Sequence, residues 1–156
     1  MLLNDLRDYI ASLLEPDRFR DYCPNGVQVE GKAEIRRIAS GVATAWNADA
    51  ILVHHGYFWR NEDAAVTGIK KQRLAYLLKH DVNLLAYHLP LDAHAELGNN
   101  AQLGKRLDFI EHGRFGEQDI ACYGELAQAQ TLAQLTQKIA HNLQRTPLVI
   151  GEGDPT

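Results

Sequence analysis

Two apolar, strand-like runs lie close together in the chain, and the short link between them restricts the folds open to it. The runs are "IRRIASGVA" (35–43) and "AILVHH" (50–55), and only "TAWNAD" (44–49) separates them. A crossover between parallel neighbouring strands needs about a dozen residues or more. Six residues cannot carry a helix, so the sequence predicts that these strands form an antiparallel hairpin or are not neighbours in the sheet.

Helical and strand-like patterns alternate along the rest of the chain. Apolar residues recur at helical spacing in 4–14, 67–80 and 131–143, and a further helix is expected to begin within 98–109. Further strands are expected at Val27–Val29, within 82–92 before a turn, and at the start of 147–156. Strands alternating with helices indicate an α/β fold.

Composition and charge narrow the class of protein. With 156 residues, the chain fits one domain or two small lobes that share a core. Its net charge of −4 argues against a domain built mainly to bind the phosphates of a nucleic acid. Cys23 and Cys122 are isolated, so neither a zinc knuckle nor a disulfide framework is predicted.

The N-terminus and the hydropathy pattern bear on location. "MLLNDLRDYI" carries charges within its first turns and lacks the layout of a signal peptide. No apolar run approaches the roughly 18 residues that would span a bilayer. We therefore expect a soluble cytoplasmic protein without a membrane partner.

Polar residues of metal-binding types follow two of the apolar runs. His54 and His55 end one run, and His88 and Asp92 follow another. Ligands of α/β proteins bind outside the carboxyl ends of strands, and imidazole and carboxylate are usual ligands for zinc, iron or manganese. Consecutive side chains on a strand point to opposite faces, so the two histidines can share one metal only if the strand breaks there or else serve two neighbouring metals. Gly56 supplies such a break, and an aspartate can bridge two ions.

Each of these residues also has an ordinary structural explanation. The histidine pair could cap a strand, and His88 could hydrogen-bond a turn before Pro90. Asp92 could cap the segment that follows it or pair with His94 at the surface. Other chemistries have less support, because no G-x-S-x-G elbow, P-loop or G-x-G-x-x-G after a strand occurs. Cys23 is disfavoured as a nucleophile, because nothing near it in sequence would lower its pKa.

Four ordered motifs resemble those of the Nif-three-like family, whose members are often described as GTP cyclohydrolase I type two homologues. These motifs are "DYCPNGVQVEG" (21–31), "ADAILVHHGYFW" (48–59), "GIKKQRLAYLLKHDVNL" (68–84) and "YHLPLDAHAELGNNAQL" (87–103). The resemblance covers nearly the whole chain, most strongly residues 20–104. "HHGYFW" and "HLPLDAH" are similar to the bacterial YbgI-type subgroup.

The resemblance implies a fold, an assembly and a set of ligands. It implies a two-lobed α/β fold with a mixed sheet flanked by helices, in toroidal homohexamers that hold two divalent metal ions. The implied ligands are His54, His55 and Asp92, with His88 outside the ligand set and orienting Asp92 or a bound water. Asn25 and Gln28 are expected to support the architecture near the site. The metal could be Zn, Fe, Mn or Mg.

Two departures from the family pattern qualify this expectation. Family members have a longer segment where this chain has residues 44–49, long enough for a helix. Their remaining metal ligands, a histidine and a glutamate, lie in a C-terminal G-E motif, and Glu152 in "GEGDPT" is not in that context. We therefore expect residues 1–156 to be a single family domain that lacks the internal helix and the C-terminal part, in a shortened version of a longer protein.

Two functions of different classes follow. The first is a dinuclear metal-dependent hydrolase that uses a metal-activated water on a nucleotide or another small substrate. Hydrolysis of a GTP ring is implied only by the family's description, because nothing in these residues reads guanine. The second is a non-catalytic, metal-binding scaffold or regulatory protein that forms rings.

Overall fold

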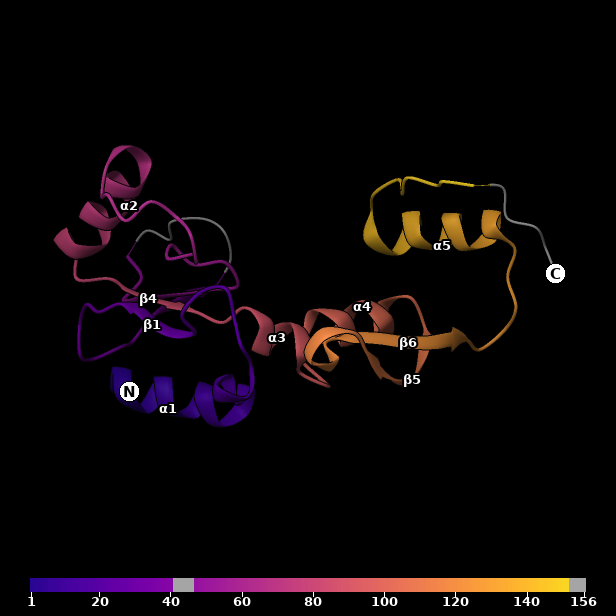
Figure 1. Cartoon of the computed structure of the whole chain (residues 1–156), viewed down its shortest axis with the longest axis horizontal. Coiled ribbons are helices and arrows are strands. Elements are labelled where there is room, and N and C mark those ends of the chain that lie inside the picture. The colour runs from indigo at the N-terminus through magenta and orange to yellow at the C-terminus, as the bar shows by residue number, and fades with distance from the viewer. Residues whose placement is uncertain (41–46, 152–156) are drawn as a thin grey trace. The chain divides into compact units, whose positions relative to one another are not determined.

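The structure, a computed structural model, describes residues 1–40 and 47–151, in two compact units, Met1–Asp92 and Ala93–Thr156 (Figure 1). The elements of the first unit are α1 (Leu3–Leu14), η1 (Pro16–Arg18), β1 (Gly26–Val29), β2 (Ile38–Ser40), β3 (Ala50–Val53), α2 (Gly68–Lys79), β4 (Asn83–Ala86) and α3 (Leu89–Ala93), whose last residue begins the second unit. The second unit contains α4 (Asn99–Arg106), β5 (Phe109–Phe115), η2 (Glu117–Asp119), β6 (Ala121–Leu126) and α5 (Leu132–Leu143).

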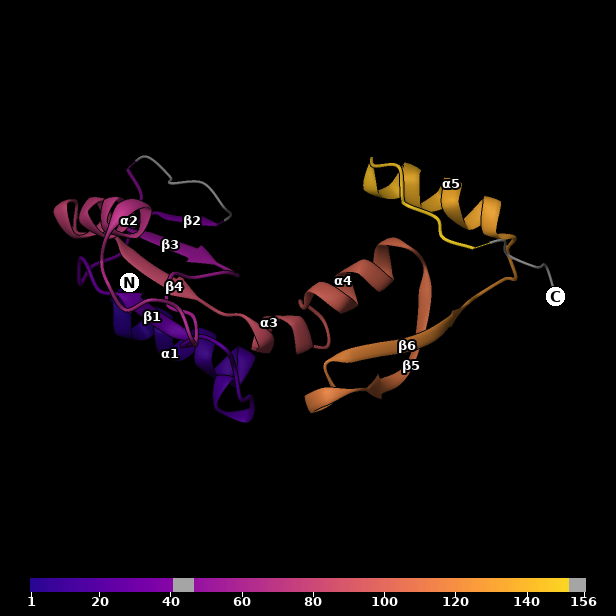
Figure 2. The ribbon, with the colours of Figure 1, turned by 45° about the horizontal axis from the view of Figure 1, so that its top comes forward.

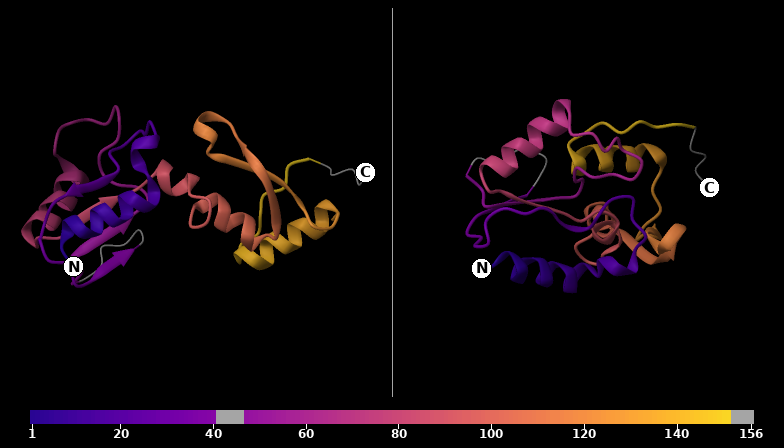
Figure 3. Two further views of the ribbon diagram at one scale, coloured as in Figure 1. Left: turned by 90° about the horizontal axis from the view of Figure 1, so that it is seen from below. Right: turned by 60° about the vertical axis from the view of Figure 1, so that its left-hand side comes forward.

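The first unit is built on a four-stranded mixed sheet in the order β1-β4-β3-β2. Strands β2, β3 and β4 run parallel, and β1 runs antiparallel to β4. Helices α1 and α2 lie on opposite faces of this sheet (Figures 2 and 3). The mixed sheet and its flanking helices confirm the predicted α/β class.

Successive apolar side chains of the central strands point to opposite faces of the sheet, so a hydrophobic core forms on each face. On the α1 face, Leu85 and Tyr87 pack with the apolar stripe of the helix, which consists of Leu3, Leu6, Ile10 and Leu14. On the α2 face, Leu84 and Ile51 pack against Leu74 and Leu77. Each fully buried leucine contributes about 1.5–3 kcal/mol, so both helices are held by burial rather than by helix propensity.

The predicted relation between the first two strand-like runs is wrong. Strands β2 and β3 are parallel neighbours, with Ile38 opposite Ala50 and Ser40 opposite Leu52. Within the described residues β2 ends at Ser40 and β3 begins at Ala50, so nine positions separate the two described strands. Nine residues reach about 30 Å, whereas a three-residue strand is only about 10 Å long, so the chain can return without a helix. The predicted strand residues 41–43 and link residues 44–46 lie outside the described residues.

Two buried polar side chains fasten the amino ends of these parallel strands. The carboxylate of Asp49 accepts hydrogen bonds from the backbone N–H groups of Arg36 and Arg37, both at 3.0 Å, and from Nζ of Lys32 at 3.2 Å. Asn83 is fully buried; it accepts from Gly31 N and donates to the carbonyls of Lys32 and Asp49. These contacts satisfy backbone groups that the short strands leave unpaired.

The second unit consists of a β-hairpin with helices. Strands β5 and β6 pair antiparallel from Phe109 opposite Leu126 to Phe115 opposite Ala121. No strand was predicted at this hairpin, whereas helices were predicted where α4 and α5 lie. The strand expected after Pro147 is not formed within the described residues up to 151.

No helix in the described part of the chain is both long and apolar enough to cross a membrane. That residues 1–156 form a single family domain stays a prediction.

Candidate metal centre

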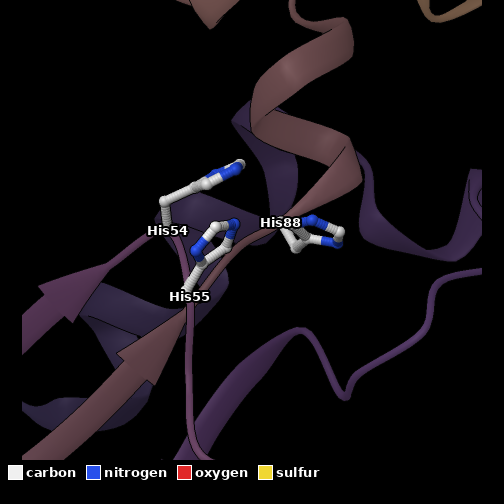
Figure 4. A group of neighbouring side chains, drawn as sticks. All are labelled: His54, His55 and His88. Atoms are coloured by element: carbon white, nitrogen blue, oxygen red, sulfur yellow. The ribbon is translucent and has the colours of Figure 1, made fainter. Parts of the chain in front are cut away.

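The parallel pairing of β3 and β4 brings the histidines together. Val53 lies opposite Ala86 at the carboxyl ends of the two strands, so the residues that follow leave the sheet at the same edge. His54 and His55 come directly after β3, and His88 lies two residues beyond β4 (Figure 4). We call these three residues the histidine cluster.

The three imidazoles of the histidine cluster are close enough to act together. Their ring centroids are separated by 4.5 Å between His54 and His55, 5.0 Å between His54 and His88, and 5.3 Å between His55 and His88. One nitrogen from each lies within 4.8 Å of the others. Imidazole nitrogens at such separations are groups that could hold a metal ion.

Asp92 lies beside this cluster on α3, as the sequence analysis expected for a ligand. Its Oδ2 is 3.6 Å from Nε2 of His54, and its side chain is partly exposed. The structure therefore places Asp92 next to His54, while the group of potential ligand atoms that all lie within 4.8 Å of one another consists of the three histidines. His88 is one of these three potential ligands, and its expected place outside the ligand set stays a prediction.

His54 has the properties of a ligand imidazole. Burial lowers the pKa of His54, Asp92 opposes this shift, and His55 and His88 add to it, so the ring is neutral at pH 7. A neutral imidazole is the form that binds metal. Its Nδ1 is buried, and a hydrogen bond with the backbone of Tyr87 raises the pKa of the ring against the effect of burial. The residues present therefore fit a divalent metal.

Asp21 is the site residue that the sequence analysis missed. Its Oδ1 lies 2.7 Å from Nδ1 of His88, and Oδ2 accepts from Leu89 N at 2.9 Å and from Nδ2 of Asn25 at 2.8 Å. Burial raises the pKa of Asp21, but these hydrogen bonds and one from Tyr22 N outweigh burial and lower it overall. The ionised carboxylate fixes the ring of His88 and leaves Nε2 as its available nitrogen. The only sequence signal was its place at the start of "DYCPNG".

Asn25 and Gln28 connect the loops around the site, as expected. The backbone N–H of His88 donates to Oδ1 of Asn25 at 2.8 Å. Gln28 donates to the carbonyl of Pro24 and accepts from Tyr57 N, each at 2.8 Å. A Cβ on Gly56 would lie 2.1 Å from Oε1 of Gln28, so a larger residue at this position would displace the Gln28 amide from its hydrogen bond with Tyr57 N.

Cys23 lacks the properties of a nucleophile. Burial, together with the charge of Asp21, raises the pKa of the Cys23 thiol to about 11. The thiol is therefore protonated at pH 7, in agreement with the sequence analysis. Asp21, Cys23 and His88 form a second group of possible ligand atoms, but the carboxylate in that group already accepts hydrogen bonds on both oxygens.

The profile of the Duf34/NIF3 (NGG1p interacting factor 3) family matches residues 1–156. The chain belongs to the NIF3 family. Among its relatives are proteins named GTP cyclohydrolase 1 type 2 homolog. The one from Neisseria meningitidis serogroup A is 48% identical over 161 residues, covering 97% of this chain and 65% of the relative. The one from Vibrio cholerae is 48% identical over 156 residues, covering 93% of this chain and 62% of the relative.

Solved structures of NIF3-like proteins have the same fold. The protein ybgI superposes with a TM-score of 0.90 at 41% identity, covering 95% of this chain and 63% of that protein. TTHA1606 from Thermus thermophilus gives a TM-score of 0.81 at 31% identity, covering 95% and 64%. These matches confirm the predicted family and its resemblance to the YbgI-type subgroup. The chain thus spans slightly less than two thirds of the length of these NIF3 relatives.

Proposed function

We propose that this NIF3 chain supplies part of a divalent-metal centre in a hydrolase that acts on a small molecule, with a GTP cyclohydrolase-like reaction as one form of it. The observation that carries the proposal is the histidine cluster, in which one nitrogen from each of the three imidazoles lies within 4.8 Å of the others. The printed name of the relatives, GTP cyclohydrolase 1 type 2 homolog, supports the direction of the proposal.

In this proposal His54, His55 and Asp92 hold the metal, and two ions occupy the centre. When bound, such ions would lower the pKa of a coordinated water and polarise the bond under attack. Asp21 holds His88 through Nδ1, which leaves Nε2 as the available nitrogen of that ring. Asp92, 3.6 Å from His54, adds a carboxylate beside a cluster that otherwise consists of imidazoles.

Metal content tests the site. After dialysis against Zn²⁺, Mn²⁺ or Fe²⁺, we expect the chain to retain up to two equivalents by elemental analysis. His55→Ala should lose most of this metal while keeping its circular dichroism spectrum. His141→Ala removes an exposed histidine of α5 and is the matched control, with unchanged metal content. Equal metal in all three proteins would refute the assignment.

Turnover separates the two functional classes. The metal-loaded protein should hydrolyse GTP or a simple phosphodiester such as bis(p-nitrophenyl) phosphate. Chromatography of the products measures this hydrolysis. Two equivalents of bound metal without hydrolysis of either would favour the non-catalytic scaffold.

A toroidal homohexamer and a cytoplasmic location complete the proposal. The hexamer predicts a particle of about six times the 17.5 kDa mass of one chain, measurable by mass photometry. Fractionation of cells that express the protein tests its location.

A further inference from the structure

An open pocket lies beside the histidine cluster and is not used by the metal ligands. Two segments of the first unit, residues 21–24 and 58–60, border a shallow, open pocket of about 430 Å³. A flat ligand could lie against its wall without being enclosed.

The two walls of this pocket are fastened to each other by Arg60. Its backbone N–H donates to the carbonyl of Tyr22 at 2.7 Å, and its Nη2 donates to the carbonyl of Asp21 at 2.8 Å. The guanidinium also lies over the Tyr22 ring, 5.5 Å from the centroid. The pocket is therefore formed before any ligand arrives, which lowers the entropic cost of binding.

Trp59 connects the pocket to the histidine cluster. Its indole is nearly perpendicular to the rings of His55 and His88, with centroid separations of 5.4 Å and 5.0 Å. The indole N–H donates to the carbonyl of Gly56 at 3.1 Å, which fixes the ring. A ligand lying against Trp59 would thus be next to the imidazoles.

The chemistry of the lining selects a planar and anionic ligand. Trp59, Phe58 and Tyr22 offer aromatic surface, on which flat heterocycles stack. Arg60 adds a positive charge. A guanidinium has five N–H donors, and among the described residues one of them donates a hydrogen bond, to the carbonyl of Asp21. The carboxylate of Asp21 also borders the pocket, but its side chain is 4% exposed and its charge is taken up by His88 and its other donors.

We infer that Trp59 and Arg60 determine substrate specificity, with Trp59 stacking on an aromatic heterocycle and Arg60 binding its phosphate. The inference rests on the proposed function, because it assumes that the bond to be broken is presented to the histidine cluster. It goes beyond that proposal by assigning the recognition of a nucleotide to two particular residues.

Fluorescence of Trp59 gives a direct test. The chain has two tryptophans, so Trp46→Phe leaves Trp59 as the single emitter. We expect GMP to quench this emission saturably. Ribose 5-phosphate, which lacks the base, should not quench it, and guanosine, which lacks the phosphate, should bind more weakly than GMP. Equal responses to GMP and ribose 5-phosphate would overturn the assignment to Trp59.

Variants measured by calorimetry separate the two roles. Trp59→Leu should raise the Kd for GMP at least about tenfold, and Trp59→Phe should retain most of the affinity. Arg60→Gln should weaken GMP about tenfold more than it weakens guanosine, because the lost wall contact affects both ligands and the lost phosphate contact affects GMP alone. Arg73→Gln is the matched control, because Arg73 also lies over an aromatic ring, that of Tyr57, but outside the pocket. Wild-type affinity in Trp59→Leu, or equal losses in Arg60→Gln and Arg73→Gln, would overturn the inference.

Metal content measured on the same samples keeps the two proposals distinct. If GMP binds through Trp59 to protein that takes up no metal, the pocket is supported and the metal centre is refuted. If the protein takes up metal and GMP does not bind, the pocket is refuted and the metal centre stands.

Discussion

The two compact units of the chain differ sharply in how they bury apolar surface. The first has a continuous core on both faces of its sheet, including fully buried Leu77, Leu85 and Ala50. Among the described residues of the second unit, only Gly98, Ala101 and Leu107 are buried. Its hairpin and α4 leave large apolar side chains exposed: Leu103, Phe109, Ile110, Phe115 and Tyr123.

This difference implies that the two units are stabilised in different ways, the first by its buried core and the second by local pairs of side chains. The predicted site residues, Asp21 and the Trp59 pocket all belong to the first unit, where rigid packing can hold side chains in place. The hairpin of the second unit depends on cross-strand pairs such as Phe115 with Tyr123 and His112 with Glu125, which contribute little each. We therefore expect the first unit to carry most of the unfolding free energy.

The largest expected effect comes from a matched pair of leucine truncations. Leu77→Ala in the core of the first unit should lower the unfolding free energy by about 2–5 kcal/mol, because the side chain is fully buried. Leu103 in α4 is 45% exposed, so Leu103→Ala should lower the unfolding free energy by less than about 0.5 kcal/mol. Urea unfolding followed by circular dichroism measures both. Similar losses would mean that the two units are equally well packed.

The next effect depends on pH and again distinguishes the units. Hydrogen bonds from the backbone of Arg36 and Arg37, and from Lys32, lower the pKa of Asp49 below 3.8. A carboxyl with a lower pKa in the folded state stabilises the fold above its unfolded pKa, and that stabilisation is lost as pH falls through the folded pKa. Asp49→Asn should therefore be less stable than the wild type at pH 7, with the difference shrinking below about pH 4.

The control for Asp49 lies in the second unit. Asp108 pairs with Lys138 at 3.0 Å, but its side chain is 75% exposed, so Asp108→Asn should leave urea midpoints nearly unchanged at either pH. A loss of stability in Asp49→Asn that stays constant from pH 7 to pH 3 would contradict the role given to its charge.

A smaller effect is expected from the cap of α5. The Thr131 side chain accepts from Gln134 N at 3.2 Å, and Oε1 of Gln134 accepts from Thr131 N at 2.9 Å. Thr131→Ala should lower the local stability of α5 by about 1 kcal/mol, measured as faster amide hydrogen exchange in that helix. Thr136→Ala, within the same helix, should not accelerate exchange. Faster exchange in the first unit as well would show that the units unfold together.

The sequence predicted the first unit better than the second for a physical reason. Helices with one buried stripe and strands rich in Ile and Val produce strong periodicities, and α1, α2, β3 and β4 were placed correctly. Strand β5 carries charges and exposed residues along its length, so "FIEHGRF" has no apolar alternation to reveal it. The error at β2 arose because the short separation of the two apolar runs argued against parallel pairing, whereas the described pairs Ile38 with Ala50 and Ser40 with Leu52 are parallel.

The site was predictable where residue type and strand ends coincided. The two histidines after β3 and the pair His88 and Asp92 follow apolar runs, and the parallel register brings them to one edge. Asp21 could not be found in this way, because it lies in a loop 67 residues from His88 and meets it only through tertiary folding. Trp59 looked like part of an apolar run, and its place between the histidine cluster and a pocket is visible only in three dimensions.

The smallest expected effect tests whether the core of the first unit is fully optimised. The hydroxyl of Tyr87 is buried without a hydrogen-bond partner in the described part of the chain, and burial raises its pKa. An unpaired buried hydroxyl is a cost, so Tyr87→Phe should leave the unfolding free energy unchanged or raise it by up to about 1 kcal/mol. Tyr123→Phe, at a half-exposed position of the second unit, should have no effect. A destabilisation by Tyr87→Phe would instead mean that the hydroxyl is hydrogen-bonded in solution, so that this part of the core gains stability from a polar contact.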